Sequence, residues 1–232
     1  MSVTYTIVSI EGNIGSGKST LLSNLRYHYE NNSNVVFLKE PVDEWEKIKD
    51  ENGETILKKF YADQEKYSFP FQMMAYVSRL KVLRDTLKTI KTDTEDKNIT
   101  IITERSLYTD KCVFAKMLHD SGKIEDVNYK IYLNWFYTFL DEFPVHKLIY
   151  VQALPEICHN RITKRSREGE KNISLEYLQL CNKYHNEMIN LFLDSSIPIE
   201  KQLLLDGNAD IYQNKSHDNI SKRCFDANIY KL

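Results

Sequence analysis

One octapeptide near the amino end restricts what this chain can fold into more than any other segment. Residues 12–19 read Gly-Asn-Ile-Gly-Ser-Gly-Lys-Ser and satisfy the pattern G-x-x-x-x-G-K-S/T at each fixed position. An apolar run, residues 5–10, precedes it, and a stretch with helical spacing, residues 19–29, follows it. Glycines here let backbone N–H groups turn inward around a polyphosphate, and the helix offers its positive amino end. The segment therefore predicts a nucleoside triphosphate site between a strand and a helix.

The same loop carries the side chains that phosphate chemistry needs. Lys18 is expected to reach the β- and γ-phosphates as a point charge, and the Ser19 hydroxyl can take a place on Mg²⁺. The predicted phosphate-binding residues of the loop are Gly12, Asn13, Ile14, Gly15, Ser16, Gly17, Lys18, Ser19 and Thr20. A chance glycine-rich turn is the alternative, but it does not explain the strand before the motif and the helix after it.

A phosphate loop alone does not define the reaction. A GTPase would also need an N-K-x-D motif, and residues 214–217 read Asn-Lys-Ser-His, without the aspartate. Motor and transport ATPases are usually larger than 232 residues. A small-molecule kinase remains, and other motifs must identify its acceptor.

Short apolar runs alternate with longer helical stretches along the chain. The runs are rich in β-branched, aromatic and leucine residues, which is typical of strands buried on both faces of a parallel sheet. They occupy residues 5–10, 35–38, 99–103, 148–151 and 202–205, and the helical stretches occupy residues 19–29, 71–90, 108–119, 127–143, 155–167 and 174–193. This alternation predicts a doubly wound α/β domain.

No internal repeat or change of composition divides the chain, so one domain is expected over residues 1–232. Residues 91–98 form a polar run that predicts a mobile surface loop. The pattern weakens over residues 210–232, which predicts a loose C-terminal tail. With 42% hydrophobic and 28% charged residues, the chain has the composition of a globular protein.

Charge and cysteine content exclude several classes of protein. The 31 basic and 33 acidic residues leave a net charge of −2, which excludes a strongly basic nucleic-acid binder. No apolar run approaches the roughly 18 residues of a membrane span. The 4 cysteines are widely spaced, which argues against a zinc site or a disulfide framework and favours a reducing compartment. The amino end lacks a basic or arginine-rich targeting pattern, so we expect a cytoplasmic protein.

Two acidic motifs follow predicted strands, where α/β sheets bind their ligands. Glu40, which begins Glu-Pro-Val-Asp-Glu-Trp after the second strand, could accept a proton from an attacking hydroxyl. A solvated loop acid is the alternative. Glu104 ends the third strand and is placed to hold Mg²⁺ or its water, while Arg105 could pair with Glu40 and neutralise developing charge. A purely structural ion pair is the competing interpretation.

A basic segment, residues 161–170, follows the fourth predicted strand. On a helix, Arg161 and Arg165 share one face, and Arg167 comes soon after them. Arginines on a mobile segment can close over phosphates and exclude water at the transition state. The alternatives are a solvated basic face or a localisation signal, and the interspersed glutamates weaken the second.

Taken in order, the motifs of the chain resemble the deoxyribonucleoside kinase family, from about residue 7 to about residue 210. They read IEGNIGSGKST, EPVDEW, FPFQ, ERSLYTD, RITKRSREGE and LLLDGNAD. The resemblance implies a P-loop kinase fold, with a five-stranded parallel sheet flanked by helices and a helical lid, and usually a homodimer. It also implies transfer of the γ-phosphate of ATP, with Mg²⁺, to the 5′-hydroxyl of a deoxynucleoside.

The resemblance also implies roles for residues at matching positions. Glu40 would be the general base with Arg105 beside it, and Tyr61 and Glu170 would hold the sugar 3′-hydroxyl. Gln72 would pair with the edge of the base, and Phe114 would stack on its face. The other expected contacts are Val42, Trp45, Leu57 and Phe71 as pocket walls, Arg161, Arg165 and Arg167 as the lid, Lys18 at the phosphates, Ser19 and Glu104 at the magnesium ion, and Asp206, in the loop 206–210, near the ATP adenine. Core packing is the alternative for Trp45 and Phe71.

Three further residues bear on the choice of base. A small residue at Ala75 and an arginine at Arg79 resemble the deoxycytidine and deoxyguanosine kinases, whereas thymidine-accepting relatives carry bulkier residues there. A buried pair of Arg79 and Asp110 would crowd a thymine methyl and offer polar partners to an amino or oxo group. We therefore expect a purine deoxynucleoside or deoxycytidine to be preferred to thymidine.

Two other functions remain as alternatives. A nucleoside monophosphate kinase of the thymidylate kinase type also combines a phosphate loop with an arginine lid. Its anionic acceptor needs an arginine clamp, however, whereas Glu40 would repel such an acceptor. A catalytically silent nucleotide-binding protein would be expected to lose Glu40 or Arg105 while keeping Lys18, and this chain keeps all of them.

Overall fold

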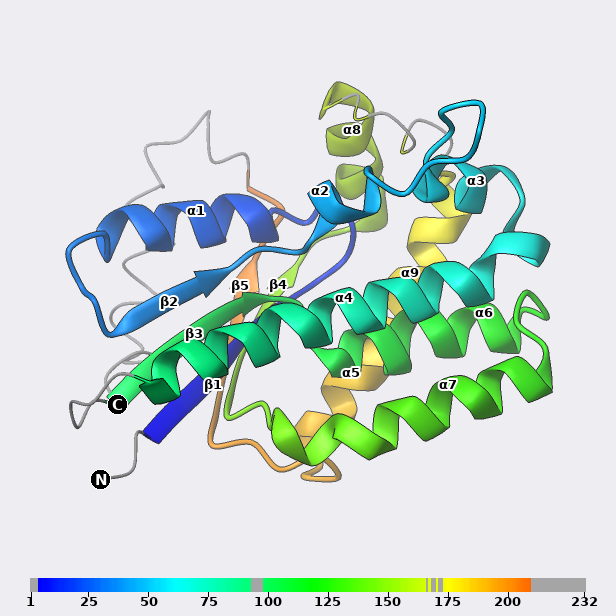
Figure 1. The fold of residues 1–232 in the computed structure, drawn as a ribbon. Helices are drawn as coiled ribbons and strands as arrows, with labels where there is room; N and C mark the ends of the chain where they lie inside the picture. The colour runs from blue at the N-terminus through cyan, green and yellow to red at the C-terminus, as the bar shows by residue number, and fades with distance from the viewer. Residues whose placement is uncertain (1–3, 93–97, 166, 168–169, 171–172, 210–232) are drawn as a thin grey trace.

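Five parallel strands in the order β2-β3-β1-β4-β5 form the centre of the molecule (Figure 1). This computed structural model describes residues 4–92, 98–165, 167, 170 and 173–209. The strands are β1 (Thr4–Glu11), β2 (Val35–Leu38), β3 (Asn98–Glu104), β4 (Lys147–Gln152) and β5 (Lys201–Asp206). Each lies where an apolar run predicts it, and the expected α/β fold with a five-stranded parallel sheet is confirmed.

Helices occupy most of the chain between the strands. They are α1 (Lys18–His28), α2 (Val42–Trp45), α3 (Ile56–Ala62), α4 (Gln64–Thr92), α5 (Leu107–Thr109), the π-helical turn η1 (Asp110–Ala115), α6 (Lys116–Asp120), α7 (Asp126–Phe139), the 3-10 turn η2 (Leu140–Glu142), α8 (Pro155–Arg165) and α9 (Leu175–Leu193). Of the helices that the structure describes, none is long and apolar enough to cross a membrane. The cytoplasmic location stays a prediction.

Some helical segments differ from the sequence expectation. Helix α4 begins at Gln64, before residue 71, so Pro70 lies inside the helix and not at its start. Helix α7 ends at Phe139, and η2 takes the place of the last predicted turn. The sequence pattern does not predict α2 and α3, because such short helices show no helical period. Residues 93–97 of the predicted mobile loop and the predicted tail, 210–232, lie outside the described residues.

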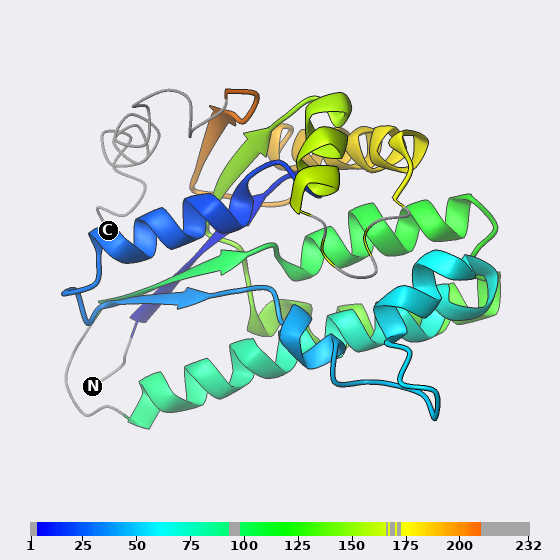
Figure 2. The ribbon, with the colours of Figure 1, turned by 90° about the horizontal axis from the view of Figure 1, so that it is seen from above.

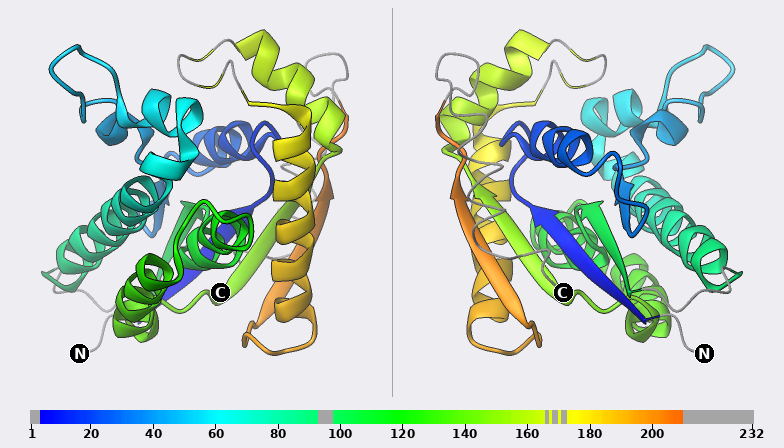
Figure 3. Two further views of the ribbon diagram at one scale, coloured as in Figure 1. Left: turned by 90° about the vertical axis from the view of Figure 1, so that its right-hand side faces the viewer. Right: turned by 90° about the vertical axis from the view of Figure 1, so that its left-hand side faces the viewer.

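Successive strand residues face opposite sides of the sheet, and both sides are buried. Val8 and Ile10 pack with Leu22 of α1. Ile7 packs on the other side, with buried side chains of α4 and α7, and Leu148 of β4 packs with α9 on that same side. Figure 3 shows α1 separated by the strands from α4, α7 and α9. The helices therefore form layers on both faces, as a doubly wound sheet requires.

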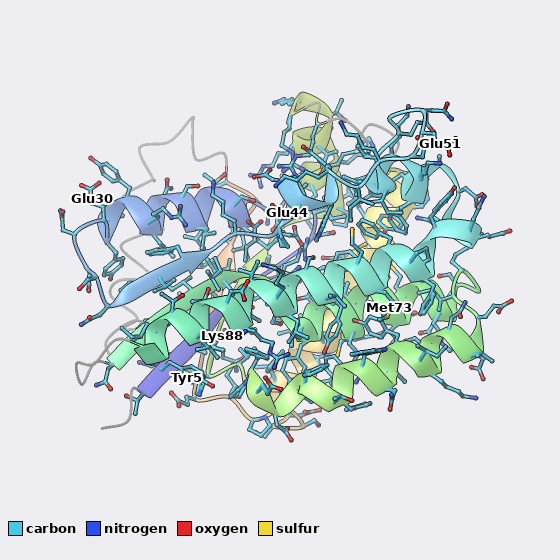
Figure 4. The ribbon with its side chains drawn as sticks, in the orientation of Figure 1. Tyr5, Glu30, Glu44, Glu51, Met73 and Lys88 are labelled. Atoms are coloured by element: carbon cyan, nitrogen blue, oxygen red, sulfur yellow. The ribbon has the colours of Figure 1, made fainter. Side chains whose placement is uncertain are left out.

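The carboxyl ends of the strands meet at one edge of the sheet, because all strands are parallel. Figure 2 shows α2 and α3 on one side of this edge and α8 on the other. Figure 4 labels two exposed side chains on the α2 and α3 side of this edge, Glu44 on α2 and Glu51 before α3. The motifs at residues 12–19, 40–45 and 104–110 end or follow strands and therefore arrive at this edge, whereas FPFQ, residues 69–72, lies on α4.

Candidate active site

Two glycines of the phosphate loop have positive φ angles and lie against other segments. Gly12 has φ +146°, and a Cβ there would lie 2.5 Å from the carbonyl oxygen of Val151. Gly15 has φ +78°, and a Cβ there would lie 2.7 Å from the carbonyl oxygen of Cys158. Real Cβ atoms do not approach backbone so closely. The strand β4 and the helix α8 therefore press directly on the loop, which only glycine permits.

The end of the loop offers hydrogen-bond donors to a ligand. Helix α1 begins after Gly17, which supplies no side-chain cap to its amino end. The Ser16 hydroxyl is buried and has no hydrogen-bond partner among the residues that the structure describes. Backbone N–H groups at a helix amino end, together with an unused hydroxyl, suit an anion. The geometry fits the phosphates of a nucleotide.

Lys18 is buried beside this loop. Its Nζ donates a hydrogen bond to the carbonyl oxygen of Asn13, 2.7 Å away. Burial, followed by the nearby charge of Arg105, lowers the pKa of Lys18 to about 8. Negative phosphates would favour the charged ammonium and reverse this shift.

Ser19 and Glu104 fit the predicted magnesium site. The Ser19 hydroxyl donates to Glu104 Oε1, 2.6 Å away, although the two residues come from α1 and β3. In the part of the chain that the structure describes, no three His, Cys, Asp or Glu side chains cluster as a metal site. One hydroxyl and one carboxylate are a donor set for a Mg²⁺ ion that keeps water and nucleotide phosphates as its other ligands.

Glu40 follows β2 and points its carboxylate at two arginines. Glu40 Oε1 lies 2.9 Å from Arg79 Nη2 and 3.2 Å from Arg105 Nε. The predicted pair with Arg105 is present, and Arg79 is a second partner that sequence reasoning did not assign. Burial alone would raise the pKa of this carboxyl, but the charges of Arg105, Arg79 and Lys18 outweigh it and lower the pKa. An ionised carboxylate therefore faces the cavity beside the phosphate loop.

The predicted pair of Arg79 and Asp110 is present and buried. Arg79 Nε donates to Asp110 Oδ2 at 2.8 Å, and Nη2 donates to Oδ1 at 3.3 Å. Burial raises the pKa of Asp110, although Arg79 opposes the shift. Asp110 and Phe114 both lie in the π-helical turn η1, a type of turn that is frequent at functional sites. With Glu40 and Arg105, the pair completes a cluster of two cations and two anions.

Arg105 lies in an unusual backbone conformation just after β3. Its φ of +67° is in the left-handed region, which residues with a Cβ rarely adopt. The buried carboxylate of Glu11, at the end of β1, accepts hydrogen bonds from the hydroxyls of Ser106 and Thr109. Because these two residues follow Arg105 closely, the bonds hold the turn that contains it. Sequence reasoning missed Glu11, since one acid in an apolar strand gives no sign of its partners.

A cavity of about 600 Å³ opens at the carboxyl edge of the sheet, a volume that suits a small-molecule ligand. Most predicted site residues line it, namely Ile14, Gly15, Ser16, Gly17, Lys18, Ser19, Thr20, Glu40, Val42, Trp45, Leu57, Tyr61, Phe71, Gln72, Ala75, Glu104, Arg105, Asp110, Phe114, Arg161, Arg165, Arg167, Glu170 and Asp206. Gly12, Asn13 and Arg79 lie behind the wall and support it. The Asn13 side chain, for example, donates to the carbonyl oxygen of Leu178 at 2.9 Å.

Aromatic side chains form one wall of the cavity. Phe71 of α4 stacks on Phe60 at a centroid distance of 4.5 Å and meets Trp45 edge-on at 5.5 Å. The guanidinium of Arg105 lies 4.9 Å from the ring centroid of Phe114. Phe71 and Trp45 are buried in the core and also line the cavity, and their contact with a nucleoside stays a prediction.

The arginines of the predicted lid are held by protein oxygens. Arg161, on α8, donates to the carbonyl oxygen of Gly207 at 2.7 Å, which ties α8 to the turn after β5. Arg165 and Arg167 both pair with Glu170. Contact of these guanidiniums with phosphate stays a prediction. Residues 166, 168 and 169 of the basic segment and residue 210 of the predicted adenine loop lie outside the described residues.

Sequence reasoning missed several residues that line the cavity, namely Lys39, Asp43, Phe60, Lys164 and Tyr177. Phe60 lies on α3, which shows no pattern of its own. A signal did exist for Tyr177, because Ser174 caps α9 and accepts a hydrogen bond from the Tyr177 backbone. Helical spacing from that cap places Tyr177, Cys181 and His185 on one face of α9, toward the site.

The fold and the site together define an enzyme that transfers a phosphoryl group from a nucleotide to a small acceptor. The chain matches the family model described as Deoxynucleoside kinase over residues 8–226, and it belongs to that family. Its activity is that of an ATP-dependent deoxynucleoside kinase.

Curated relatives share about a third of their residues with this chain. A probable deoxycytidine kinase of fowlpox virus is 35% identical, over 81% of this chain and 73% of that protein. Deoxycytidine kinase 1 of Xenopus laevis is 32% identical, over 90% and 84% respectively. Human mitochondrial thymidine kinase 2 is 31% identical, over 79% and 64%. Relatives named for different nucleosides are about equally similar, so identity alone does not select the base.

Proposed function

We propose that this enzyme transfers the γ-phosphate of ATP to the 5′-hydroxyl of a purine deoxynucleoside or deoxycytidine, in preference to thymidine, for nucleotide salvage. The observation that supports this most strongly is that Glu40 and Lys18 line one cavity. A carboxylate opposite a phosphate loop can activate an uncharged alcohol, but it would repel an anionic acceptor. The acceptor is therefore a nucleoside and not a nucleotide.

The proposed roles follow from the contacts. Lys18 and the loop backbone hold the triphosphate, and Ser19 and Glu104 hold Mg²⁺, which would supply charge stabilisation at the phosphoryl oxygens. Both arginine contacts of Glu40 fall on Oε1, so we assign Oε2 to accept the hydroxyl proton. Arg105 keeps this carboxyl ionised until the proton arrives.

The lid would exchange its partners when it closes. Arg165 and Arg167 are paired with Glu170, and all three side chains line the cavity. Phosphate would compete for the two guanidiniums through charge-assisted hydrogen bonds. Glu170 would then be available, with Tyr61, to the 3′-hydroxyl of the sugar.

The proposed preference among nucleobases rests on residues of one face of α4 and of the turn η1. Gln72 and Ala75 are buried and line the cavity, and Gln72 has an amide that can donate and accept at once. Arg79, one helical turn after Ala75, holds Asp110 at the cavity wall. A thymine methyl placed against this charged pair would desolvate it without offering a hydrogen bond. An amino or oxo group could provide one.

Initial rates with Mg-ATP and each of the four deoxynucleosides test this proposal. We expect kcat/KM for the best of deoxyguanosine, deoxyadenosine and deoxycytidine to exceed that for thymidine by at least about 10-fold, the usual effect of one misplaced group in a pocket. Chelation of Mg²⁺ should abolish turnover. Equal or better use of thymidine would contradict the base preference. Faster phosphorylation of thymidine monophosphate than of any deoxynucleoside would favour the thymidylate kinase type instead.

The family resemblance suggests a homodimer, and we also propose that its two copies associate through α7. Val127, Ile131 and Trp135 lie one turn apart on one face of α7 and are 66%, 44% and 45% exposed. Helix α4 adjoins this helix, because the Tyr76 hydroxyl donates to the carbonyl oxygen of Trp135. An exposed apolar stripe on an amphipathic helix suits a symmetric interface with a second copy.

Light scattering after size-exclusion chromatography tests the dimer. The unaltered chain, of 27.4 kDa, should elute as a dimer, and Trp135→Glu should elute as a monomer, since two carboxylates would be buried at a symmetric contact. Tyr27→Glu changes an exposed ring on α1, away from this face, and should leave the mass unchanged. A monomeric unaltered chain would rule out the proposed interface.

A further inference from the structure

A buried histidine on α9 contacts the active-site arginine, and the roles assigned above do not use it. His185 is fully buried. Its Nε2 lies 3.2 Å from Arg105 Nη1, and its Nδ1 lies 2.7 Å from the carbonyl oxygen of Cys181. The Phe114 ring meets the imidazole edge-on at a centroid distance of 6.1 Å.

The two neighbours of His185 determine where its proton lies. A carbonyl oxygen can only accept, so Nδ1 must carry the hydrogen and donate it to Cys181. A guanidinium can only donate, so Nε2 must be the unprotonated acceptor for Arg105. Only one neutral tautomer satisfies both contacts. Burial, followed by the charge of Arg105, lowers the pKa of His185 and keeps the ring neutral.

The contact restricts the rotation of the Arg105 guanidinium. Nη1 has two N–H bonds, and one of them is directed at the carbonyl oxygen of Gly12, 3.0 Å away. His185 takes the other. With Nη1 held at both hydrogens, the guanidinium stays beside Glu40, and Nε lies 3.2 Å from Glu40 Oε1 as an ion pair without hydrogen-bond geometry. The Phe114 ring covers the guanidinium and leaves it little freedom to tilt.

We propose that His185 is a positioning residue for phosphoryl transfer, which holds the Arg105 guanidinium in the orientation that directs Glu40. The proposal rests on the role given to Glu40 and Arg105 under the proposed function. His185 does not line the cavity, and it reaches the residues that do through Arg105, its hydrogen-bond partner, and through the edge of the Phe114 ring. In this way the packing of α9 is linked to the position of Glu40, the proposed general base. A small rotation of the Arg105 guanidinium would displace the Glu40 carboxylate from the attacking hydroxyl.

Two substitutions separate an acceptor role from a packing role. His185→Phe keeps an aromatic ring but has no acceptor, and we expect kcat to fall about 10- to 100-fold with the deoxynucleoside KM within about threefold. His185→Gln can place an amide oxygen near the position of Nε2, and it should keep kcat within about fivefold of the unaltered enzyme. Thermal unfolding of each variant monitors the fold. Equal impairment of two folded variants would show that the acceptor is not what matters.

A double-mutant cycle tests whether His185 acts through Arg105. Arg105→Lys removes the planar fork, so His185 has no guanidinium left to orient. Adding His185→Phe to Arg105→Lys should lower kcat by less than about threefold. If the two losses instead multiply in full, the residues act independently and the proposal is wrong.

A measurement on the unaltered protein remains decisive even if His185→Phe fails to fold. Nitrogen-15 spectra of the histidine side chains at pH 7 should show His185 neutral, with its proton on Nδ1. A proton on Nε2, or on both nitrogens, would overturn the proposal. An unaltered enzyme that phosphorylates no deoxynucleoside would contradict the proposed function, whereas full activity of both His185 variants in an active enzyme would contradict this inference alone.

Discussion

Replacing Glu40 by glutamine is expected to lower kcat by about 10²- to 10⁴-fold, the range that a general base contributes. Glutamine has the same shape and can still accept a hydrogen bond from Arg79, but it cannot take the proton of the attacking hydroxyl. The Kd for the deoxynucleoside should change by less than about threefold, because only the transition state uses the charge. Steady-state rates together with calorimetric titration of the deoxynucleoside measure both quantities.

Glu44, on the exposed side of α2, offers a matched control for Glu40. Glu44 pairs with Lys47, and its side chain is 61% exposed (Figure 4). Glu44→Gln should leave kcat within about twofold, as exposed ion pairs contribute little. Turnover by Glu40→Gln that matches this control would remove Glu40 as the base, and with it the main support for the proposed function.

Replacing Arg79 by methionine is expected to produce the largest loss of stability. Arg79 is the buried cation between Glu40 and Asp110, and its removal leaves two carboxylates with too few partners. Breaking a buried pair in this way costs about 3–5 kcal/mol of unfolding free energy. For a chain of this size, that corresponds to a fall in Tm of about 6–20 °C. Calorimetry or circular dichroism at pH 7 measures the shift.

The control and the pH dependence of this effect identify its cause. Lys81→Met, on the same helix, removes an exposed pair with Asp85 and should cost less than about 0.5 kcal/mol. Burial raises the pKa of Asp110, and the loss of Arg79 would raise it further. Protonation removes the uncompensated charge, so the deficit should be largest at neutral pH and shrink as the solution is acidified. Equal effects of the two substitutions would show that the cluster does not stabilise the fold.

The parts of the fold that depend on a few consecutive residues could be predicted from the sequence. The strands β1 to β5 are short apolar runs, and burial on both faces of a parallel sheet requires no more than that pattern. The phosphate loop could be predicted because its glycines, Lys18 and Ser19 fall at fixed spacings within eight consecutive residues. The order of motifs also placed Glu40, Glu104 and Arg161 at the carboxyl edge, since each follows a strand.

Other features depend on contacts between distant segments. Helices α2 and α3 are held by packing against α4 and not by their own period. The sequence suggested one pair of Glu40 with Arg105 and another of Arg79 with Asp110. In the structure these are one cluster, because Arg79 Nη2 reaches both carboxylates from α4. Nothing in a single sequence states which carboxylate a given guanidinium will reach.

By itself, then, the sequence determined the order of the strands along the chain, the phosphate loop and the chemical groups available to the site, because motif spacing and hydrophobic periodicity involve only a few consecutive residues. Only the tertiary structure decided how those groups are oriented. Glu11 on β1 holds the turn that contains Arg105, and His185 on α9 contacts its guanidinium, although the two residues are far apart in the sequence. Their effect depends on how sheet and helix pack. The orientation of a side chain depends on the residues packed around it, and these residues come together only when the chain has folded.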